Sequence, residues 1–176
     1  SPDWTGSVGN RLQYKNLVLS ALIDIRYGGD ILSVTDALAT GAGTGARTLE
    51  GRDGMVVDGI VASTGQANTQ SVTAEQYWQS IGDAYGVGEA YLYDGTYAKL
   101  REVSFGYNIP QQLLQKSKFI KQAKISLVGR DLFYLVKHTP GTDPEGASIR
   151  SDWAQGFELN SLPSTRTLGF NVSLTF

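Results

Sequence analysis

The last ten residues, Thr167-Leu-Gly-Phe-Asn-Val-Ser-Leu-Thr-Phe176, alternate strictly between apolar side chains and small or polar ones. Successive side chains of a β-strand point to opposite faces, so this alternation predicts one apolar face and one polar face. Such a strand borders lipid or a protein core on one side and water on the other. Because the pattern runs to an aromatic carboxy-terminal residue, we interpret it first as the last strand of an outer-membrane barrel, in which lipid-facing and lumen-facing residues alternate.

The composition favours an all-β protein with many turns. Of the 176 residues, 21 are glycine, and the glycines cluster in the connections between extended stretches. The 15 basic and 17 acidic residues give a net charge of −2, and the scattered basic residues provide no footprint for nucleic acid. No stretch reaches the run of about 18 apolar residues that a membrane helix needs. Any membrane span of this chain must therefore be built from strands.

Four extended segments are predicted, over about residues 12–26, 97–109, 123–135 and 166–176. The expected fold is all-β, the carboxy-terminal four-strand portion of a transmembrane antiparallel β-barrel that includes the whole of 1–176. Two long segments, 27–96 and 136–165, alternate with a short link after Pro110. Outer-membrane barrels have short periplasmic turns and longer extracellular loops, so we expect both long segments to lie outside the cell.

One helix is predicted inside the first long segment. Thr73-Ala-Glu-Gln76 has the spacing of a capping box, with Thr73 as the N-cap and Gln76 at the third helical position. The pattern predicts a helix from Ala74 to about Ala84. A second, short helical stretch is expected within the link that follows Pro110.

Three charged residues conflict with the simple alternation. Lys99 and Arg101 share parity with Val103, which places them on the lipid-facing side, near the outer end where such a charge costs only about 0 to 1 kcal/mol. Asp131 shares the apolar parity of the third strand. Either the lipid zone ends near Gly129, or a β-bulge resets the register there.

Several stretches match a known family in order and in approximate separation. They are Ser-Pro-Asp-Trp-Thr-Gly at 1–6, Tyr-Lys-Asn-Leu-Val-Leu-Ser at 14–20, Asp24-Ile-Arg-Tyr-Gly-Gly-Asp30, Tyr97-Ala-Lys-Leu-Arg-Glu-Val-Ser-Phe-Gly-Tyr-Asn-Ile-Pro110, Val128-Gly-Arg-Asp-Leu-Phe133, Gly141-Thr-Asp-Pro-Glu145 and the terminal strand. Together they resemble the carboxy-terminal region of the SusC/RagA-type TonB-dependent (TonB-linked) outer-membrane transporters of Bacteroidetes. The chain departs from the family at Arg130-Asp131, where an amide pair is more usual, and in its long Gly-, Ala- and Thr-rich loop.

The resemblance implies that the chain is roughly the last fifth of a larger transporter in the Gram-negative outer membrane. The signal peptide, the plug and the segment that contacts TonB would precede Ser1. The implied activity is active nutrient import driven by the TonB system, with an oligosaccharide or a peptide as cargo. The implied partners are membrane lipid and a SusD-like surface lipoprotein that closes over the barrel. Phe176 resembles the signal that barrel assembly machinery recognises.

Two groups of residues are candidate cargo or lid contacts. Aromatic rings in the long segments can stack on sugars or fill a wet protein interface, although Trp78 can instead pack the predicted helix down. Charged residues on the polar parity of the strands can line the passage or pair with one another. The candidates are Trp78, Tyr91, Tyr93 and Trp153 in the loops, and Asp24, Arg26 and Arg130 in the strands.

No catalytic residue, cofactor or metal site is expected. The chain has no cysteine and a single histidine, His138, so nucleophilic triads and histidine-based metal sites lack their residues. The loop carboxylates are interpreted as turn formers and solvated charges, and Asp143-Pro-Glu145 lacks the spaced acidic series of a calcium loop. A transporter is therefore expected, and not an enzyme.

The alternative is a soluble β-sandwich module that binds carbohydrate or protein. Its strands would alternate in the same way, because one sheet would pack on another. The two hypotheses differ in one observable property: a sandwich buries its apolar face, whereas a barrel of this kind exposes it to lipid.

Overall fold

The computed structural model describes residues 1–83, 86–115, 119–146 and 155–176. The chain divides into two compact units. Unit 1 consists of Ser1–Gly29, Asp94–Pro140 and Pro163–Phe176, and unit 2 consists of Asp30–Tyr93 and Gly141–Leu162. Unit 2 is thus assembled from the two long segments that the sequence suggested were separate loops.

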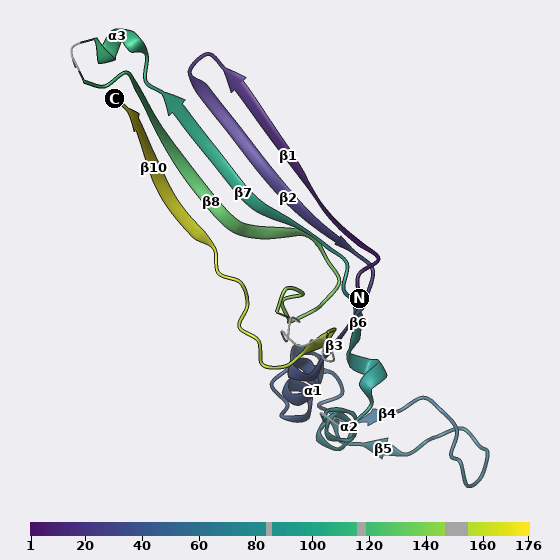
Figure 1. The fold of residues 1–176 in the computed structure, drawn as a ribbon. Coiled ribbons are helices and arrows are strands. Elements are labelled where there is room, and N and C mark those ends of the chain that lie inside the picture. The colour runs from purple at the N-terminus through teal and green to yellow at the C-terminus, as the bar shows by residue number, and fades with distance from the viewer. Residues whose placement is uncertain (84–85, 116–118, 147–154) are drawn as a thin grey trace. The chain divides into compact units, whose positions relative to one another are not determined.

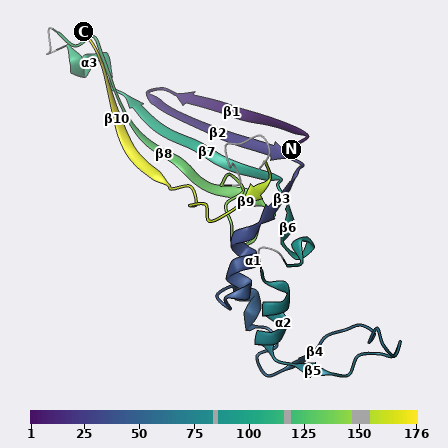
Figure 2. The same ribbon diagram turned by 60° about the horizontal axis from the view of Figure 1, so that its bottom comes forward.

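Unit 1 is an antiparallel sheet of five strands in the order β1-β2-β7-β8-β10. Figures 1 and 2 show these strands side by side, with the carboxy-terminus and the short helix α3 (Gln111–Leu114) at the same end of the sheet. The strands are β1 Trp4–Tyr14, β2 Leu17–Tyr27, β7 Tyr97–Asn108, β8 Gln122–Lys137 and β10 Thr167–Thr175. Strands predominate over helices in the chain, in agreement with the all-β expectation.

The sheet has one strand more than the four-strand portion predicted from the sequence. The stretch predicted as a single strand over 12–26 is interrupted by a turn at Lys15-Asn16, and β1 pairs with β2 along its whole length. Lys15 has a φ of 51°, the left-handed conformation that a tight turn requires. The prediction missed β1 because glycine favours turns, whereas Gly6 and Gly9 lie within β1 and pair with residues of β2.

The register gathers most of the large apolar side chains of the five strands on one face, which we call the apolar face. Its larger members are Trp4, Val8, Leu12, Tyr14, Leu17, Leu19, Ile23, Ile25, Tyr27, Leu100, Val103, Phe105, Tyr107, Ile125, Leu127, Phe133, Leu168, Phe170, Val172 and Leu174. Many of them are strongly exposed: Leu127 is 64% and Phe170 78% accessible to solvent. The opposite face, called the polar face, carries residues such as Ser104 and Asn171.

A bulge in the middle of the sheet corrects the prediction for the charged residues of β7. The register between β2 and β7 shifts between Leu22 and Ile23, which leaves Arg101 of β7 as an extra residue. Between β7 and β8, Arg101 lies opposite two residues, Asp131 and Leu132, and Asp131 has a φ of 51°. The shift moves Lys99 to the polar face, where it pairs with Asp24 of β2, and away from the lipid-facing side where we expected it. Of the two alternatives offered for Asp131, the bulge is confirmed.

Unit 2 contains the helices α1 (Val34–Gly41) and α2 (Ala74–Ile81) and an arm that carries β4 and β5. In both ribbon views the arm extends away from the two helices (Figures 1 and 2). The remaining elements are β3 Asp30–Ser33, η1 Ala46–Leu49, β4 Met55–Val56, β5 Ser71–Val72, η2 Gly88–Tyr91, β6 Leu92–Asp94 and β9 Phe157–Glu158. β3 lies between β6 and β9 and pairs with β9 in parallel.

The predicted capping box is confirmed. The Thr73 hydroxyl accepts from the backbone N–H of Gln76, and the Gln76 side chain accepts from the backbone N–H of Thr73. The helix ends at Ile81, before the predicted end at Ala84, which lies outside the described residues. At this end α2 meets α1 very closely, since a Cβ on Gly41 would lie 1.8 Å from the carbonyl oxygen of Gly82. Only glycine fits at position 41, because a Cβ atom there would clash with the backbone of Gly82.

Candidate functional site

The polar face of the sheet carries a network of ion pairs at the bulge. Arg101 donates to the carboxylate of Asp24 at 2.6 Å and to that of Asp131 at 2.5 Å. The ammonium group of Lys99 lies 3.4 Å from the carboxylate of Asp131 and donates to the hydroxyl of Ser164 at 2.7 Å. The network therefore joins β2, β7 and β8 to the segment that precedes β10, and it compensates two cations with two carboxylates.

The three charged strand residues singled out from the sequence all lie on the polar face, but they do not pair with one another. Asp24 pairs with Arg101, and Arg130 donates to Glu102 at 2.9 Å. For Arg26, the Nε atom is shielded from solvent and has no hydrogen-bond partner among the described residues. Any contact of these residues with cargo stays a prediction.

Two aromatic candidates, Tyr91 and Tyr93, belong to the interior of unit 2. Tyr91 is 1% exposed, and the guanidinium of Arg47 lies 5.2 Å from its ring centre. The Tyr93 hydroxyl donates to Asp36 and accepts from Arg47 at 2.5 Å, while Arg47 also forms an ion pair with Asp36 at 2.9 Å. Burial, reinforced by the carboxylate of Asp36, raises the pKa of Tyr93 to about 12. These contacts give both rings a structural role in holding α1 against η1 and η2.

A buried carboxylate joins the two segments of unit 2. Glu158 is 1% exposed and accepts from the hydroxyls of Ser33 at 2.7 Å and Thr35 at 2.7 Å. It also accepts from Ser161, at 2.6 Å from the hydroxyl and 3.2 Å from the backbone N–H. Burial alone would raise the pKa of the Glu158 carboxyl, but these hydrogen bonds outweigh it and hold the pKa below its ordinary value. Hydrogen bonds thus stabilise the charged form here.

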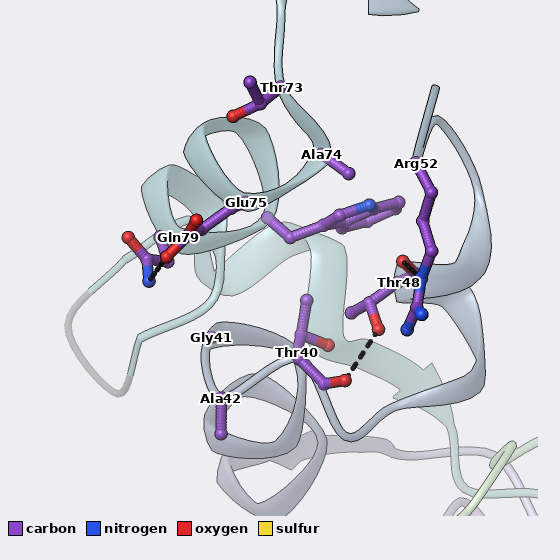
Figure 3. A pocket seen from close by; sticks show the side chains of 11 residues that line it. Thr40, Gly41, Ala42, Thr48, Arg52, Thr73, Ala74, Glu75 and Gln79 are labelled. Carbon is purple, nitrogen blue, oxygen red and sulfur yellow. Dashed lines mark hydrogen bonds between the residues drawn. The ribbon is translucent and has the colours of Figure 1, made fainter. Parts of the chain in front are cut away.

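A pocket of about 480 Å³ lies within unit 2, between α1, α2 and η1. Figure 3 shows Arg52 on one side of it and Glu75 with Gln79 on the other. Its lining residues are Thr40, Gly41, Ala42, Gly43, Thr48, Arg52, Thr73, Ala74, Glu75, Trp78 and Gln79. Trp78 is 9% exposed, and its indole N–H donates to the carbonyl oxygen of Glu50 at 3.1 Å. The helix-packing interpretation of Trp78 thus agrees with the structure, and the ring also lines the pocket.

Of the two remaining candidates, Trp153 and Phe176, only Phe176 lies within the described residues. Phe176 follows the end of β10 and is 69% exposed. Its role as an assembly signal stays a prediction.

The sequence alone did not reveal the groups that organise both units. Glu158, Asp36 and Arg47 act through partners far away in sequence, and no local pattern identifies them. For Arg101 and Asp131 a signal was present, because charges on an apolar parity indicate a change of register.

The comparisons with known proteins concern the whole chain. No protein-family model matches it. Over 182 residues the chain is 29% identical to TonB-dependent receptor P3 of Formosa agariphila, and the match covers 100% of the chain and 16% of that receptor. The predicted resemblance to TonB-dependent transporters is confirmed.

Solved structures show a similar fold. The RagAB peptide importer in its "closed-closed" state matches 100% of this chain and 17% of its own chain, with a TM-score of 0.69 and 18% identity. In the "open-open" state the TM-score is 0.66, with 18% identity and the same coverage. The chain therefore spans less than a fifth of each transporter-like relative, and none of these relatives is named as an enzyme.

The described residues hold neither a membrane-spanning helix nor a metal-binding cluster. No helix in the described part of the chain has the length and apolar character to cross a membrane. Within the same residues, no group of three or more His, Cys, Asp and Glu side chains could hold a metal ion.

Proposed function

We propose that this chain is the carboxy-terminal part of the barrel of an active outer-membrane importer. In this proposal the five strands of unit 1 close the barrel together with strands outside the chain, and unit 2 lies at the cell surface. The imported cargo is an oligosaccharide or a peptide, and the TonB system supplies the energy through a part of the protein that precedes this chain.

The exposed apolar face is the observation that carries the proposal. A soluble protein rarely exposes contiguous apolar patches larger than a few hundred Å². Here the exposed apolar side chains extend over all five strands, including Leu12 in β1 and Phe170 in β10. Tyr14 and Tyr107 lie near one end of this face and Trp4 and Tyr27 near the other, as in the aromatic girdles of membrane barrels. A soluble sandwich would bury such a face, so no observation favours that alternative.

The connections between the strands support the orientation. At one end of the sheet, β1 joins β2 through Lys15-Asn16, and β7 joins β8 through residues 109–121. At the other end the chain leaves the sheet twice, after β2 and after β8, to form unit 2. Short periplasmic turns and long extracellular segments have this asymmetry.

The proposed partners follow from the resemblance to the SusC/RagA family. They are outer-membrane lipid at the apolar face, a SusD-like surface lipoprotein and TonB. RagAB is named as a peptide importer, which supports a nutrient-import role without deciding between a peptide and an oligosaccharide.

Protease shaving of intact source cells tests the proposal. Peptides released from this protein are identified by mass spectrometry, with lysed cells as the control that all sites can be cleaved. We expect release from residues 30–93 and 141–162 and protection of the strands and of 109–121. Recovery of the whole protein in a soluble fraction, or release of 109–121 from intact cells, would contradict the proposal.

A further inference from the structure

The chain contains three Asp-Gly pairs, at 53–54, 58–59 and 94–95, and all three lie within the described residues. An Asp-Gly pair can rearrange without an enzyme, because glycine has no Cβ to keep its backbone nitrogen away from the preceding carboxyl carbon. The rearrangement needs a carboxyl group that can turn and a glycine N–H that no hydrogen bond holds. The three pairs differ in both respects.

The pair at 94–95 is held by hydrogen bonds on both sides. The carboxylate of Asp94 accepts from the backbone N–H of Thr96 at 2.8 Å, and the N–H of Gly95 donates to the carbonyl oxygen of Gly29 at 2.7 Å. Hydrogen bonds from the hydroxyl and the backbone N–H of Thr96 also hold the pKa of Asp94 below its ordinary value. The neutral form of this carboxyl, which is the form that can lose water, is therefore disfavoured.

The pair at 53–54 is held by a turn. The N–H of Gly54 donates to the carbonyl oxygen of Gly51 at 2.9 Å, and Asp53 lies within the turn that this bond closes. The surroundings of Gly54 are crowded as well, since a Cβ placed on it would lie 3.3 Å from the hydroxyl oxygen of Ser71. The nitrogen of Gly54 can reach the carboxyl carbon of Asp53 only after this turn has opened.

The pair at 58–59 lies in the arm of unit 2 and meets both conditions. Asp58 and Gly59 are exposed, and within the described residues neither the Asp58 carboxylate nor the Gly59 N–H forms a hydrogen bond. No atom lies within 4 Å of the position that a Cβ on Gly59 would take. The arm extends away from the two helices of its unit (Figure 1), which leaves the pair open to water.

We propose that Asp58 isomerises spontaneously to isoaspartate in the folded protein. The nitrogen of Gly59 attacks the carboxyl carbon of Asp58, and the carboxyl hydroxyl leaves as water with the proton of the N–H. Water then opens the resulting succinimide ring. Opening at the side-chain carbonyl restores aspartate, whereas opening at the main-chain carbonyl gives isoaspartate, whose main chain runs through the former side chain. One water leaves and one water enters, so the atoms balance and nothing is oxidised or reduced.

The change would loosen the arm. Asn68 holds both sides of the pair, because its side-chain amide donates to the carbonyl oxygen of Val57 at 2.9 Å and its backbone N–H donates to that of Gly59 at 2.8 Å. Isoaspartate adds one carbon atom to the main chain between these two carbonyl groups, so Asn68 can no longer bond to both. The arm of an aged protein should therefore exchange its amide hydrogens faster than that of a new one. This inference does not depend on the proposed function.

The test follows the uptake of oxygen-18 from enriched water by the complete protein, purified in detergent. The buffer is weakly acidic but above the range in which Glu158 is protonated. Each succinimide that opens inserts one atom of oxygen-18, and fragmentation mass spectrometry after proteolysis locates it. We expect uptake at Asp58 to be about tenfold faster than at Asp53 or Asp94, the factor for first breaking one hydrogen bond. In protein unfolded by urea, the three rates should be similar.

Two exposed substitutions complete the test. Asp58→Glu keeps the charge but needs a six-membered ring, which forms far more slowly, so uptake at position 58 and the loosening of the arm with age should both be lost. Asp53→Glu is the matched control and should change neither. Equal uptake at the three pairs of the folded protein would overturn the inference. So would a folded protein that forms no isoaspartate at position 58 when its unfolded form does, or an arm that loosens with age equally in Asp58→Glu.

Discussion

The carboxylate of Glu158 accepts a 2.7 Å hydrogen bond from the hydroxyl of Ser33, a residue 125 positions earlier in the chain. Ser33 is also the N-cap of α1, where its hydroxyl accepts from the backbone N–H of Asp36 at 3.2 Å. One serine therefore links the parallel β3–β9 pair to the first turn of α1. Two segments separated by β7 and β8 in sequence thus fold as one body.

Replacing Glu158 should loosen both segments of unit 2 together. Glu158→Ala removes the acceptor for Ser33, Thr35 and Ser161 in a buried place, at a cost of about 1 to 3 kcal/mol. Hydrogen exchange of the complete protein should show faster exchange in 30–36 and in 157–161. Glu89→Ala, on the surface of the same unit, is the control and should change neither segment. Faster exchange in 157–161 alone would contradict a shared role for the carboxylate.

Acid should produce the same loosening in the unchanged protein. Hydrogen bonds hold the pKa of Glu158 below its ordinary value of 4.5, so the folded protein binds this proton more weakly than the unfolded chain. The stabilisation is present above about pH 4.5 and is lost as the pH falls toward the lower pKa of the folded state. The protection factors of 30–36, which are corrected for the intrinsic pH dependence of exchange, should fall more through this range in the original protein than in Glu158→Gln, which has no such proton to bind. The same pH dependence of protection in the original protein and in Glu158→Gln would contradict a role for the Glu158 proton.

Tyr93 should ionise late, and its stabilising contribution to unit 2 should be lost only in alkali. Because its pKa is raised to about 12, from an ordinary value of 10.0, the folded protein retains the phenolic proton that the unfolded chain loses. Its contribution is complete below pH 10.0 and is lost as the pH rises toward 12. Ultraviolet difference spectra of the original protein and Tyr93→Phe should differ by one tyrosine that ionises near pH 12. A difference that titrates near pH 10.0 would contradict the burial of this hydroxyl.

Arginine on the two faces of β10 should have opposite consequences for membrane assembly. Val172 lies on the apolar face opposite Ile125, and Asn171 lies on the polar face opposite Ser126. Val172→Arg in the complete protein should cost about 2 to 4 kcal/mol if this residue lies near the membrane midplane, whereas Asn171→Arg should be tolerated. The measurement is the amount of folded protein in the outer-membrane fraction. Equal assembly of the two variants would refute the register as a lipid–water boundary.

Substitutions at Asp131 should separate the effect of its charge on stability from the effect of its strained backbone conformation. Asp131→Asn removes the ion pair with Arg101, worth about 1 kcal/mol between partly exposed groups, and the ion pair with the buried Lys99. Asparagine tolerates the left-handed backbone. Asp131→Ala adds about 1 kcal/mol of strain to that loss, whereas Asp131→Gly does not. The midpoints of thermal unfolding should therefore fall least for Asn and Gly and most for Ala. If the Asp131→Ala and Asp131→Gly proteins unfold at the same temperature, the left-handed backbone of Asp131 at the bulge is refuted.

The sequence by itself determined the features that depend on residues close together along the chain. The alternation of Leu168 to Leu174 predicted the faces of β10, and the Thr73–Gln76 spacing predicted the start of α2, since pleat and capping are local effects. The composition predicted an all-β chain. A local misreading came from Gly6 and Gly9, which act in β1 as strand residues because pairing with β2 overrides their turn preference.

The tertiary structure alone decided which distant residues meet. At the bulge that carries Lys99 to the polar face, Arg101 forms ion pairs with both Asp24 and Asp131. A one-residue shift of register there changes the face of every later side chain in the strand. The two long segments fold together because Glu158 bonds to Ser33, 125 positions earlier in the chain. Such contacts leave no trace in a local pattern, because their energy depends on burial and on partners that only the folded chain brings together.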